Sequence, residues 1–185
     1  MSGFYSRSEL EKMNFKILGD NVLISRKASL YHTEEMEIGS NVRIEDFCVL
    51  NGQIKIGNNV MICVFCLLDG NSKIVIEDNV TMAARVAIHS GTDDYSGRSL
   101  FGCFAPAEAR KYRVGAQVTI KKHVIIGDGT VIMPGVTIRE GTSIGAMSFV
   151  KETTQEWSIY AGVPAKKIKD KSKEVLELYA KYKGV

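Results

Sequence analysis

Aliphatic residues recur at every sixth position along most of the chain. The series runs in four stretches, which are separated by two interruptions of two extra residues and by one long interruption. Its members are Leu18, Ile24, Leu30, Ile38, Ile44, Leu50, Ile56, Ile62, Leu68, Ile76, Met82, Ile88, Val114, Ile120, Ile126, Ile132, Ile138, Ile144 and Val150. A period of six matches neither the 3.6-residue α-helix nor the two-residue alternation of an ordinary strand. It predicts a β-solenoid with three short strands in each coil and the aliphatic residues pointing inward.

Compact residues recur four positions after most of the aliphatic ones, where they would fill the tight corners of the coils. Cys48 and Cys66 both occupy this position in successive coils, so we expect them to stack as core neighbours. The segment Cys63–Cys66 has the spacing of half a zinc site, but the chain has no second pair of this kind. The cysteines therefore predict a packed core and not a metal site.

The interruptions follow Leu30, Leu68 and Ile88, in each case the third aliphatic residue of its coil. All three insertions should therefore leave the solenoid from the same edge. The last one separates Ile88 from Val114 and predicts a protruding loop over 89–113 with about twenty extra residues. Loops of this length inside a compact domain usually carry function.

Both ends of the chain carry helical patterns. Ser6 and Glu9 have the spacing of a capping box, which predicts a short N-terminal helical cap within 1–17. Apolar residues at helical spacing predict a C-terminal helix within 169–185. That helix would cover the open end of the solenoid, which spans 18–168, or pack on a neighbouring subunit.

Charge and apolar content exclude several classes of protein. The chain has 24 basic and 21 acidic residues, and this near balance leaves no strong signature of nucleic-acid binding. Its apolar runs are too short to cross a bilayer, which argues against membrane insertion, and its first residues do not form a signal peptide. Four cysteines in such a chain favour a reducing compartment, so we expect a cytoplasmic protein.

Three segments resemble one known family. They are GFYSRSELEKMNFKILGDNVLISRKASLY near the start, KKHVIIGDGTVIMPGVTIREGTSIGAMSFV in the last coils, and the closing IYAGVPAKKIK. The last segment contains the Gly-x-Pro-Ala-Lys hallmark at Gly162, Pro164, Ala165 and Lys166. With these motifs the chain resembles the hexapeptide-repeat, left-handed β-helix acyltransferases, in particular the galactoside, maltose and polysaccharide-biosynthesis O-acetyltransferases. The left-handed sense of the predicted solenoid is taken from this resemblance.

The resemblance implies a homotrimer in which each active site lies in a cleft between two solenoids. Acetyl-CoA would be the acyl donor and would lie along this cleft, with its thioester near the protruding loop and without a metal. By position, the coenzyme A contacts fall on Asp128, Ala146, Lys151, Lys166 and Lys169. Lysines after the last coils also suit the nucleotide phosphates as mobile point charges.

The catalytic base is where the sequence departs from the resemblance. Many relatives have a histidine five residues after the aliphatic residue that opens the loop, and this chain has Asp93 there. A sugar hydroxyl is too weakly acidic to react without a base, so three hypotheses stay open. In the first, His89 is the base and Asp93 or Asp94 orients it. In the others, His123 reaches the cleft and pairs with one of these acids, or Asp93 itself is the base, with a pKa raised by Asp94 and by partial burial.

The protruding loop also carries candidate contacts to the acceptor. Tyr95 belongs to the segment DYSG, which matches the polysaccharide-modifying branch of the family, and Arg98 begins a stretch that mixes guanidinium groups with aromatic rings. Such a mixture suits a sugar or a nucleotide diphosphate attached to one. Ile125 stands where the galactoside relatives carry tryptophan, which argues against a simple galactoside pocket.

These patterns predict a cytoplasmic, acetyl-CoA-dependent O-acetyltransferase that acts on a sugar, a sugar nucleotide or a glycan precursor in cell-surface polysaccharide biosynthesis. N-transfer to an amino sugar on a nucleotide is the close alternative, because an amine has a proton that is easily removed. A non-catalytic binding or scaffolding solenoid is an alternative of another class. Zinc-dependent hydration of carbon dioxide would need three converging histidines, and one of His32, His89 and His123 should lie several coils away from the others.

Overall fold

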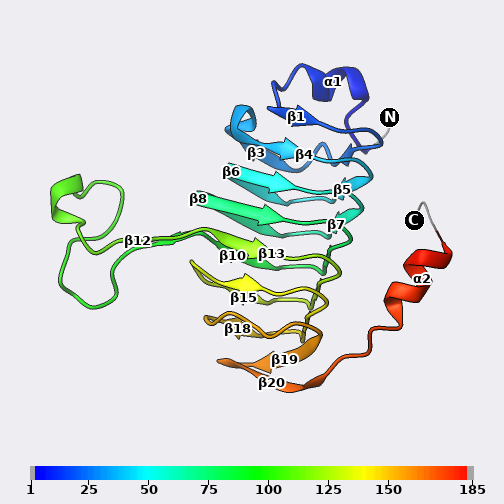
Figure 1. Ribbon diagram of the computed structural model, residues 1–185. Helices are drawn as coiled ribbons and strands as arrows, with labels where there is room; N and C mark the ends of the chain where they lie inside the picture. The colour runs from blue at the N-terminus through cyan, green and yellow to red at the C-terminus, as the bar shows by residue number, and fades with distance from the viewer. Residues whose placement is uncertain (1–2, 183–185) are drawn as a thin grey trace.

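The computed structural model describes residues 3–182 and shows a column of stacked coils with one long protrusion (Figure 1). Most of its regular structure is short parallel strand, with three strands to a coil, so the column has three faces. Figure 1 places the helix α1 (Arg7–Glu11) at the N-terminal end of the column. The chain is therefore an all-β solenoid, as the six-residue period predicts.

The strands stack in order along each face. The first face holds β1 (Ile17–Leu18), β4 (Glu37–Ile38), β13 (Val118–Ile120) and β16 (Thr137–Ile138), with the ends of β6 (Val49–Ile56) and β8 (Leu67–Ile76). The second face holds β2 (Leu23–Ile24), β5 (Val42–Ile44), β7 (Val60–Ile62), β9 (Thr81–Met82), β14 (Ile125–Ile126), β17 (Ser143–Ile144), β19 (Ser158–Gly162) and β20 (Ala165–Asp170). The third face holds β3 (Ser29–Tyr31), the starts of β6 and β8, β10 (Ala87–His89), β15 (Val131–Ile132) and β18 (Phe149–Val150). Because β6 and β8 bend around one edge of the column, the first and third faces belong to one hydrogen-bonded sheet.

The predicted aliphatic series fills the interior of the column. Apart from Leu18, Leu30 and Val114, its members are at most 3% exposed. Parallel pairing places like residues in contact between coils, as with Leu50 and Leu68. Burial of each such side chain contributes roughly 1.5–3 kcal/mol, so the six-residue pattern accounts for most of the core.

Cys48 and Cys66 stack inside the column, as predicted. They are 0% and 1% exposed and precede paired residues of adjacent coils. Cys48 Sγ donates to Cys63 O at 3.0 Å, and Cys66 Sγ donates to Ala83 O at 3.1 Å. The neighbouring Cys48 thiol, followed by burial, raises the pKa of the Cys66 thiol. Both cysteines therefore pack as small core side chains.

The long interruption extends further than the sequence predicts. Val114, expected to restart the inward series, is 49% exposed, and the series restarts at Ile120, which pairs with Ile76 in the preceding coil. Val114 instead belongs to β12 (Val114–Gly115), which pairs antiparallel with β11 (Gly91–Thr92). These two strands form a stalk that carries the loop away from the column (Figure 1). The expected restart at Val114 is wrong because a stalk valine happens to fall on the six-residue spacing.

The C-terminal segment differs from the prediction in where its helix begins and lies. Lys169 and Asp170 belong to β20, which forms an antiparallel hairpin with β19, and the helix α2 spans Val175–Lys181. Figure 1 shows α2 beside the column, on the opposite side from the protruding loop, so it does not cover the end of the solenoid. Residues 183–185 of the predicted helix lie outside the described residues, and packing on a neighbouring subunit stays a prediction.

The N-terminal helix α1 begins with the predicted capping interaction. Ser6 donates its backbone N–H to the Glu9 carboxylate at 2.8 Å, and Arg26 Nη2 lies 2.6 Å from the same carboxylate. The hydrogen bond from Arg26, followed by those from Ser6, lowers the pKa of Glu9 to about 2.

The short 3₁₀ turns η1 (Thr33–Glu35) and η2 (Ala107–Ala109) complete the regular structure. In residues 3–182 no helix has the length and apolar character that crossing a bilayer requires.

Candidate active site

A cavity of about 520 Å³ lies where the loop leaves the third face of the column. It is lined by His89, Gly91, Thr92, Tyr95, Val131, Met133 and Phe149. The first four come from the end of β10 and the root of the loop, and the other three come from the next two coils. The cavity therefore combines an imidazole with an apolar wall beside the loop in which the sequence predicts chemistry.

Strand register explains why these residues meet. The inward residues of β10, β15 and β18 pair in parallel, so the residues that follow them occupy equivalent positions in three successive coils. These residues are His89, Met133 and Lys151. Neighbouring strands lie roughly 4.8 Å apart, which places Met133 beside His89 and Lys151 about 10 Å from it. The side chain of His89 is 33% exposed, so a bound substrate can reach it.

Asp69 is a further candidate for the active site that the sequence patterns did not indicate. It pairs with His89 from the preceding coil, and its Oδ2 lies 4.0 Å from His89 Nδ1. That distance is too long for a hydrogen bond but short enough for electrostatic attraction. Asn71 donates to Asp69 Oδ1 at 2.6 Å and holds the carboxylate in place. A carboxylate on this side favours the proton on Nδ1 and leaves Nε2 free to accept another.

Asp94 organises the loop. Its carboxylate accepts hydrogen bonds from the backbone N–H groups of Ser96, Arg98 and Ser99 at 2.9, 3.0 and 3.1 Å. Hydrogen bonds from Ser96, followed by those from Arg98 and Ser99, lower the pKa of Asp94 to about 2. The group is therefore ionised and a weak proton acceptor at neutral pH. Its partners belong to the loop and not to His89, which departs from the hypothesis that Asp94 orients this imidazole.

Asp93 and Tyr95 lie on the loop just beyond the stalk. Asp93 Oδ2 accepts a hydrogen bond from the Gly102 N–H at 3.1 Å and so ties two parts of the loop together. Tyr95 is 90% exposed and lines both the cavity beside His89 and a neighbouring cavity of about 390 Å³, which Asp93 also lines. Tyr95 therefore connects the cavity beside His89 with the cavity of the outer loop. The base role of Asp93 and the acceptor contact of Tyr95 stay predictions.

Arg98 is held by its own loop. Its guanidinium carbon lies 4.4 Å from the centre of the Tyr112 ring, and its Nε donates to Ser96 Oγ at 2.9 Å. A cation placed over an aromatic face is positioned in advance, which suits a contact to a diphosphate. Substrate binding by Arg98 stays a prediction.

His123 lies on a different edge of the column from His89. It follows the first strand of its coil, β13, where its backbone N–H donates to Asp78 O at 3.3 Å, whereas the loop leaves after the third strand. Its ring centre is 4.8 Å from that of Tyr179 and 6.2 Å from that of Trp157. Within one chain, therefore, His123 does not pair with an acid of the loop. The reason is geometric. His123 lies at the corner that follows the first strand of its coil, and the loop leaves from the corner that follows the third strand.

Protonation of His123 is expected to weaken the packing of α2 on the column. Its Nδ1 is buried without a hydrogen-bond partner in the part of the chain that the structure describes, and burial lowers the pKa of the imidazole. The charged groups that act on the ring are Glu140, Lys122, Lys171 and Asp78. Because the folded-state pKa lies below the unfolded value of about 6.5, the stability that this group contributes is present above that pH. It is lost as the pH falls below it.

The chain's single tryptophan, Trp157, reports on this packing. We expect its fluorescence to change when the pH drops from about 7.5 to about 5.5. In His123→Phe, which keeps an aromatic ring and removes the titration, the change should disappear. A change of equal size in the variant would contradict the assignment to His123.

The residues expected to contact coenzyme A border the third face and the C-terminal end of the column. They are Asp128, Ala146, Lys151, Lys166 and Lys169. Asp128 and Ala146 lie at the edge between the second and third faces, and the Asp128 carboxylate is 2.5 Å from Arg85 Nη2. A Cβ at Gly127 would lie 2.5 Å from Ala146 N, so glycine is required for the coils to stack there. Lys166 and Lys169 lie on β20, and Lys151 is in line with His89.

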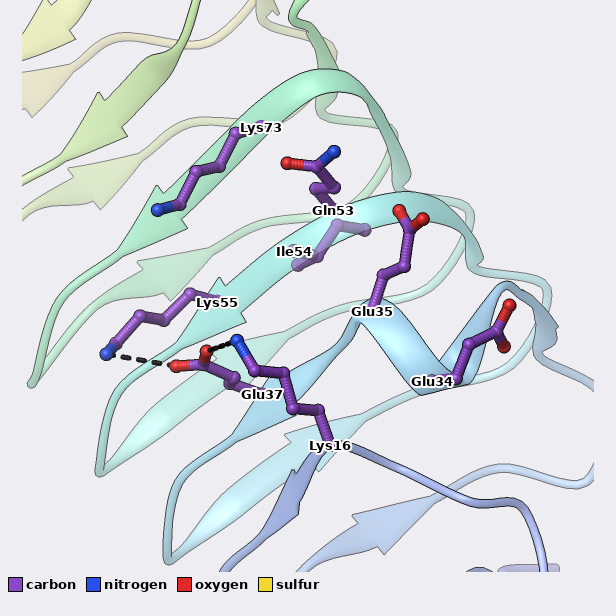
Figure 2. Close-up of a pocket in the computed structure, with 8 residues that line it drawn as sticks. All are labelled: Lys16, Glu34, Glu35, Glu37, Gln53, Ile54, Lys55 and Lys73. Carbon is purple, nitrogen blue, oxygen red and sulfur yellow. Dashed lines mark hydrogen bonds and ion pairs between the residues drawn. The ribbon is translucent and has the colours of Figure 1, made fainter.

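Another cavity, of about 270 Å³, lies nearer the N-terminus at the edge between the third and first faces (Figure 2). Figure 2 shows Glu37 between Lys16 and Lys55, whose Nζ atoms lie 2.6 and 3.0 Å from its carboxylate. Hydrogen bonds from Lys16 and then Lys55 lower the pKa of Glu37 to about 2. This cavity holds paired charges and is lined by neither an imidazole nor a thiol. The cavity beside His89 is therefore the candidate active site.

The three histidines do not converge. His32 is exposed beside Glu34, His89 borders the cavity, and His123 packs against α2. Across residues 3–182 no group of three histidine, cysteine, aspartate or glutamate side chains is placed to hold a metal ion.

Comparisons with known proteins agree with this architecture. The family described as Bacterial transferase hexapeptide (six repeats) matches residues 35–70 and 113–152. A dTDP-4-amino-4,6-dideoxy-D-glucose acyltransferase of Escherichia coli is 41% identical over 178 residues, which cover 95% of this chain and 92% of the relative. The likeness therefore extends over the coils, the stalk and the loop.

Solved structures show the same fold. AntD, an N-acyltransferase from Bacillus cereus in complex with dTDP and 3-hydroxybutyryl-CoA, is 42% identical with a TM-score of 0.95, over 98% of this chain and 97% of its own. A maltose O-acetyltransferase from Clostridium difficile 630 is 24% identical with a TM-score of 0.60, over 90% of this chain and 75% of its own, and shares the fold. These likenesses confirm the predicted fold class, the left-handed parallel β-helix of hexapeptide repeats.

Proposed function

The chain belongs to the family of bacterial hexapeptide-repeat transferases, and from this we propose that it is an N-acyltransferase acting on a nucleotide-linked amino sugar, with a coenzyme A thioester as donor. One observation carries the proposal. Two relatives match nearly the whole chain. One, at 41% identity, is an acyltransferase named for a dTDP-linked 4-amino sugar. The other, at 42% identity, is an N-acyltransferase in complex with dTDP and an acyl-CoA. N-transfer is therefore better supported than the O-transfer that the sequence alone favours.

An amino acceptor also fits the chemistry of this chain. A neutral amine attacks a thioester without prior deprotonation, and the nitrogen becomes acidic only after the bond has formed. A base of moderate strength then suffices, whereas a sugar hydroxyl needs help at the moment of attack. This agrees with a loop that carries Asp93 where many relatives carry histidine.

In the proposed mechanism donor and acceptor meet directly beside His89. The amine nitrogen attacks the thioester carbonyl carbon, a C–N bond forms, and the carbonyl oxygen becomes an oxyanion that a backbone N–H stabilises. His89 Nε2 takes the proton from nitrogen, and the Asp69 carboxylate, 4.0 Å from Nδ1, stabilises the imidazolium. The C–S bond then breaks, and the departing sulfur receives the proton from His89. The products are an amide and free coenzyme A, so no covalent enzyme intermediate is required.

The donor is proposed to lie along the edge between the second and third faces of the column. Lys166 and Lys169 on β20 would meet the phosphates, and Asp128 and Ala146 would contact the pantetheine. Lys151 stands in the same line as His89 and adds a cation near the cavity. On the acceptor side, the loop residues named above would hold the sugar nucleotide, with Asp93, Tyr95 and Arg98 at its sugar and diphosphate.

We also propose that the active enzyme is a cytoplasmic homotrimer. Phe101 and Phe104 on the loop are 74% and 98% exposed in a single chain. Large aromatic rings that project together from a loop favour coverage by a partner. A neighbouring solenoid that receives this loop would cover the rings and enclose the cavity beside His89.

Thiol release from acyl-CoA with three acceptors tests the proposal. The acceptors are dTDP-4-amino-4,6-dideoxyglucose, the matching dTDP-6-deoxyglucose with a hydroxyl in place of the amine, and a simple galactoside. We expect kcat/KM to be highest for the amino sugar nucleotide by about 10²-fold or more, with the acyl group found on nitrogen. Faster reaction of the hydroxyl sugar would establish O-transfer instead. Failure to bind coenzyme A and to turn over any acceptor would support a non-catalytic solenoid.

A further inference from the structure

An apolar wall stands directly beyond His89 in the candidate active site. Val131, Met133 and Phe149 are partly buried and line the cavity of about 520 Å³ on the side of the later coils. The polar lining lies at the other end, on His89 and the root of the loop. The cavity is thus divided into a reacting end and a hydrocarbon-lined end.

The wall offers poor contacts for the amide groups of a pantetheine arm. The Val131 N–H donates to Ser148 O at 2.9 Å, and the Met133 N–H donates to Val150 O at 3.0 Å, so these donors are already used within the solenoid. Amide oxygens placed against such a wall would lack hydrogen bonds, which is costly. Hydrocarbon placed there would lose nothing and would gain burial.

The position of Met133 ties the wall to the reacting atoms. Met133 occupies the same place as His89 one coil further on, about 4.8 Å along the stack. A carbonyl carbon attacked beside His89 must therefore have its attached acyl chain close to Met133. Cavities of roughly 300–1,000 Å³ hold whole small ligands, so a single acetyl methyl would leave most of this one unfilled.

We propose that this cavity binds the acyl chain of the donor and that Met133 sets its length, so that the preferred donor carries a short aliphatic chain longer than acetyl. The inference rests on the proposed function, because it concerns the donor of the same reaction. A flexible methionine suits this position, since its side chain adapts to chains of slightly different shape. Phe149 closes the far side of the same wall.

A series of acetyl-, butyryl- and hexanoyl-CoA with the amino sugar nucleotide held constant tests the proposal. For the wild-type enzyme we expect kcat/KM with butyryl-CoA to exceed that with acetyl-CoA by about tenfold or more. Met133→Trp should reverse this order by filling the cavity, and Met133→Ala should move the optimum toward hexanoyl-CoA. Met61→Ala, which changes a methionine that is 38% exposed on the second face, should keep the wild-type order.

Binding without an acceptor separates this inference from the proposed function. Dissociation constants of the same three thioesters are measured by calorimetry for the wild type and both Met133 variants. If no sugar is acylated but the binding order shifts with Met133 as expected, the donor inference stands and the acceptor assignment falls. An acetyl preference in the wild type, or the same order in all three proteins, would overturn the inference.

Discussion

Replacing His89 by alanine is expected to lower kcat for acyl transfer by about 10²- to 10⁴-fold, the range that a positioned general base contributes. The imidazole borders the cavity and lies 4.0 Å from a carboxylate that steadies its protonated form. The affinity for coenzyme A should change little, because His89 is not among the proposed coenzyme contacts. Steady-state kinetics and direct binding measure the two effects, with exposed His32→Ala as the matched control.

Two further experiments separate chemistry from a structural defect. Imidazole added to His89→Ala is expected to restore part of the lost rate, which repacking alone would not do. Asp69→Asn keeps the shape of the side chain and removes its charge, so it should lower kcat less than His89→Ala and leave KM nearly unchanged. A His89→Ala enzyme with the wild-type kcat would show that this ring is not the base, and Asp93 would then be the remaining candidate within the same chain.

Ile120→Ala is expected to lower the free energy of unfolding by about 2–5 kcal/mol, whereas Val114→Ala should change it by less than about 0.5 kcal/mol. Ile120 is 0% exposed and pairs with Ile76 and Ile138 in the coils on either side. Val114 is 49% exposed on the stalk. Both residues lie on the same six-residue spacing in the sequence. The pair of variants therefore tests whether the loss of stability depends on burial of the side chain or on its position in the repeat.

Urea denaturation of the two variants and the wild type supplies the measurement, provided that the slopes of the transitions are alike. Equal and large losses in both variants would mean that Val114 lies in the core and that the series restarts there. The stalk described above would then be wrong.

The column was predictable because one physical constraint repeats along the chain. Each coil needs an inward aliphatic side chain on every strand. The six-residue spacing therefore recurs along the chain and includes residues as far apart as Ile24 and Ile144. Residues one coil apart in this series stack on one another, so the contact of Cys48 with Cys66 could be expected from their spacing. The six-residue spacing gives the wrong position for Val114. This valine belongs to the two-stranded stalk, and nothing in the sequence distinguishes a stalk valine from an inward valine of the solenoid.

The six-residue count also predicts a contact in the candidate active site. Leu68 and Ile88 stack in adjacent coils, so the residues after them, Asp69 and His89, had to be neighbours. The count also separates the edges of the column, since His123 follows a first strand and His89 follows a third. The hypothesis that His123 reaches the cleft beside the loop disregarded this difference.

The loop and the C-terminal end could not be derived in this way. The loop has no period, and its shape depends on local hydrogen bonds such as those from Ser96 and Arg98 to the Asp94 carboxylate. The helical pattern of α2 was visible, but β20 was not, because its pairing with β19 is a local hairpin outside the six-residue repeat. Residues that contact a partner chain or a ligand leave still less trace in one sequence, so the proposed coenzyme and acceptor contacts rest on resemblance and placement.

The central claim is that the solenoid presents a coenzyme A thioester to an amino sugar in the cavity beside His89. A crystal structure of the protein with coenzyme A and dTDP-4-amino-4,6-dideoxyglucose bound tests it most directly. The sulfur is expected between His89 and Met133, with the sugar nitrogen about 3 Å from His89 Nε2. A sulfur bound elsewhere, for example at the edge where His123 meets α2, would contradict the claim.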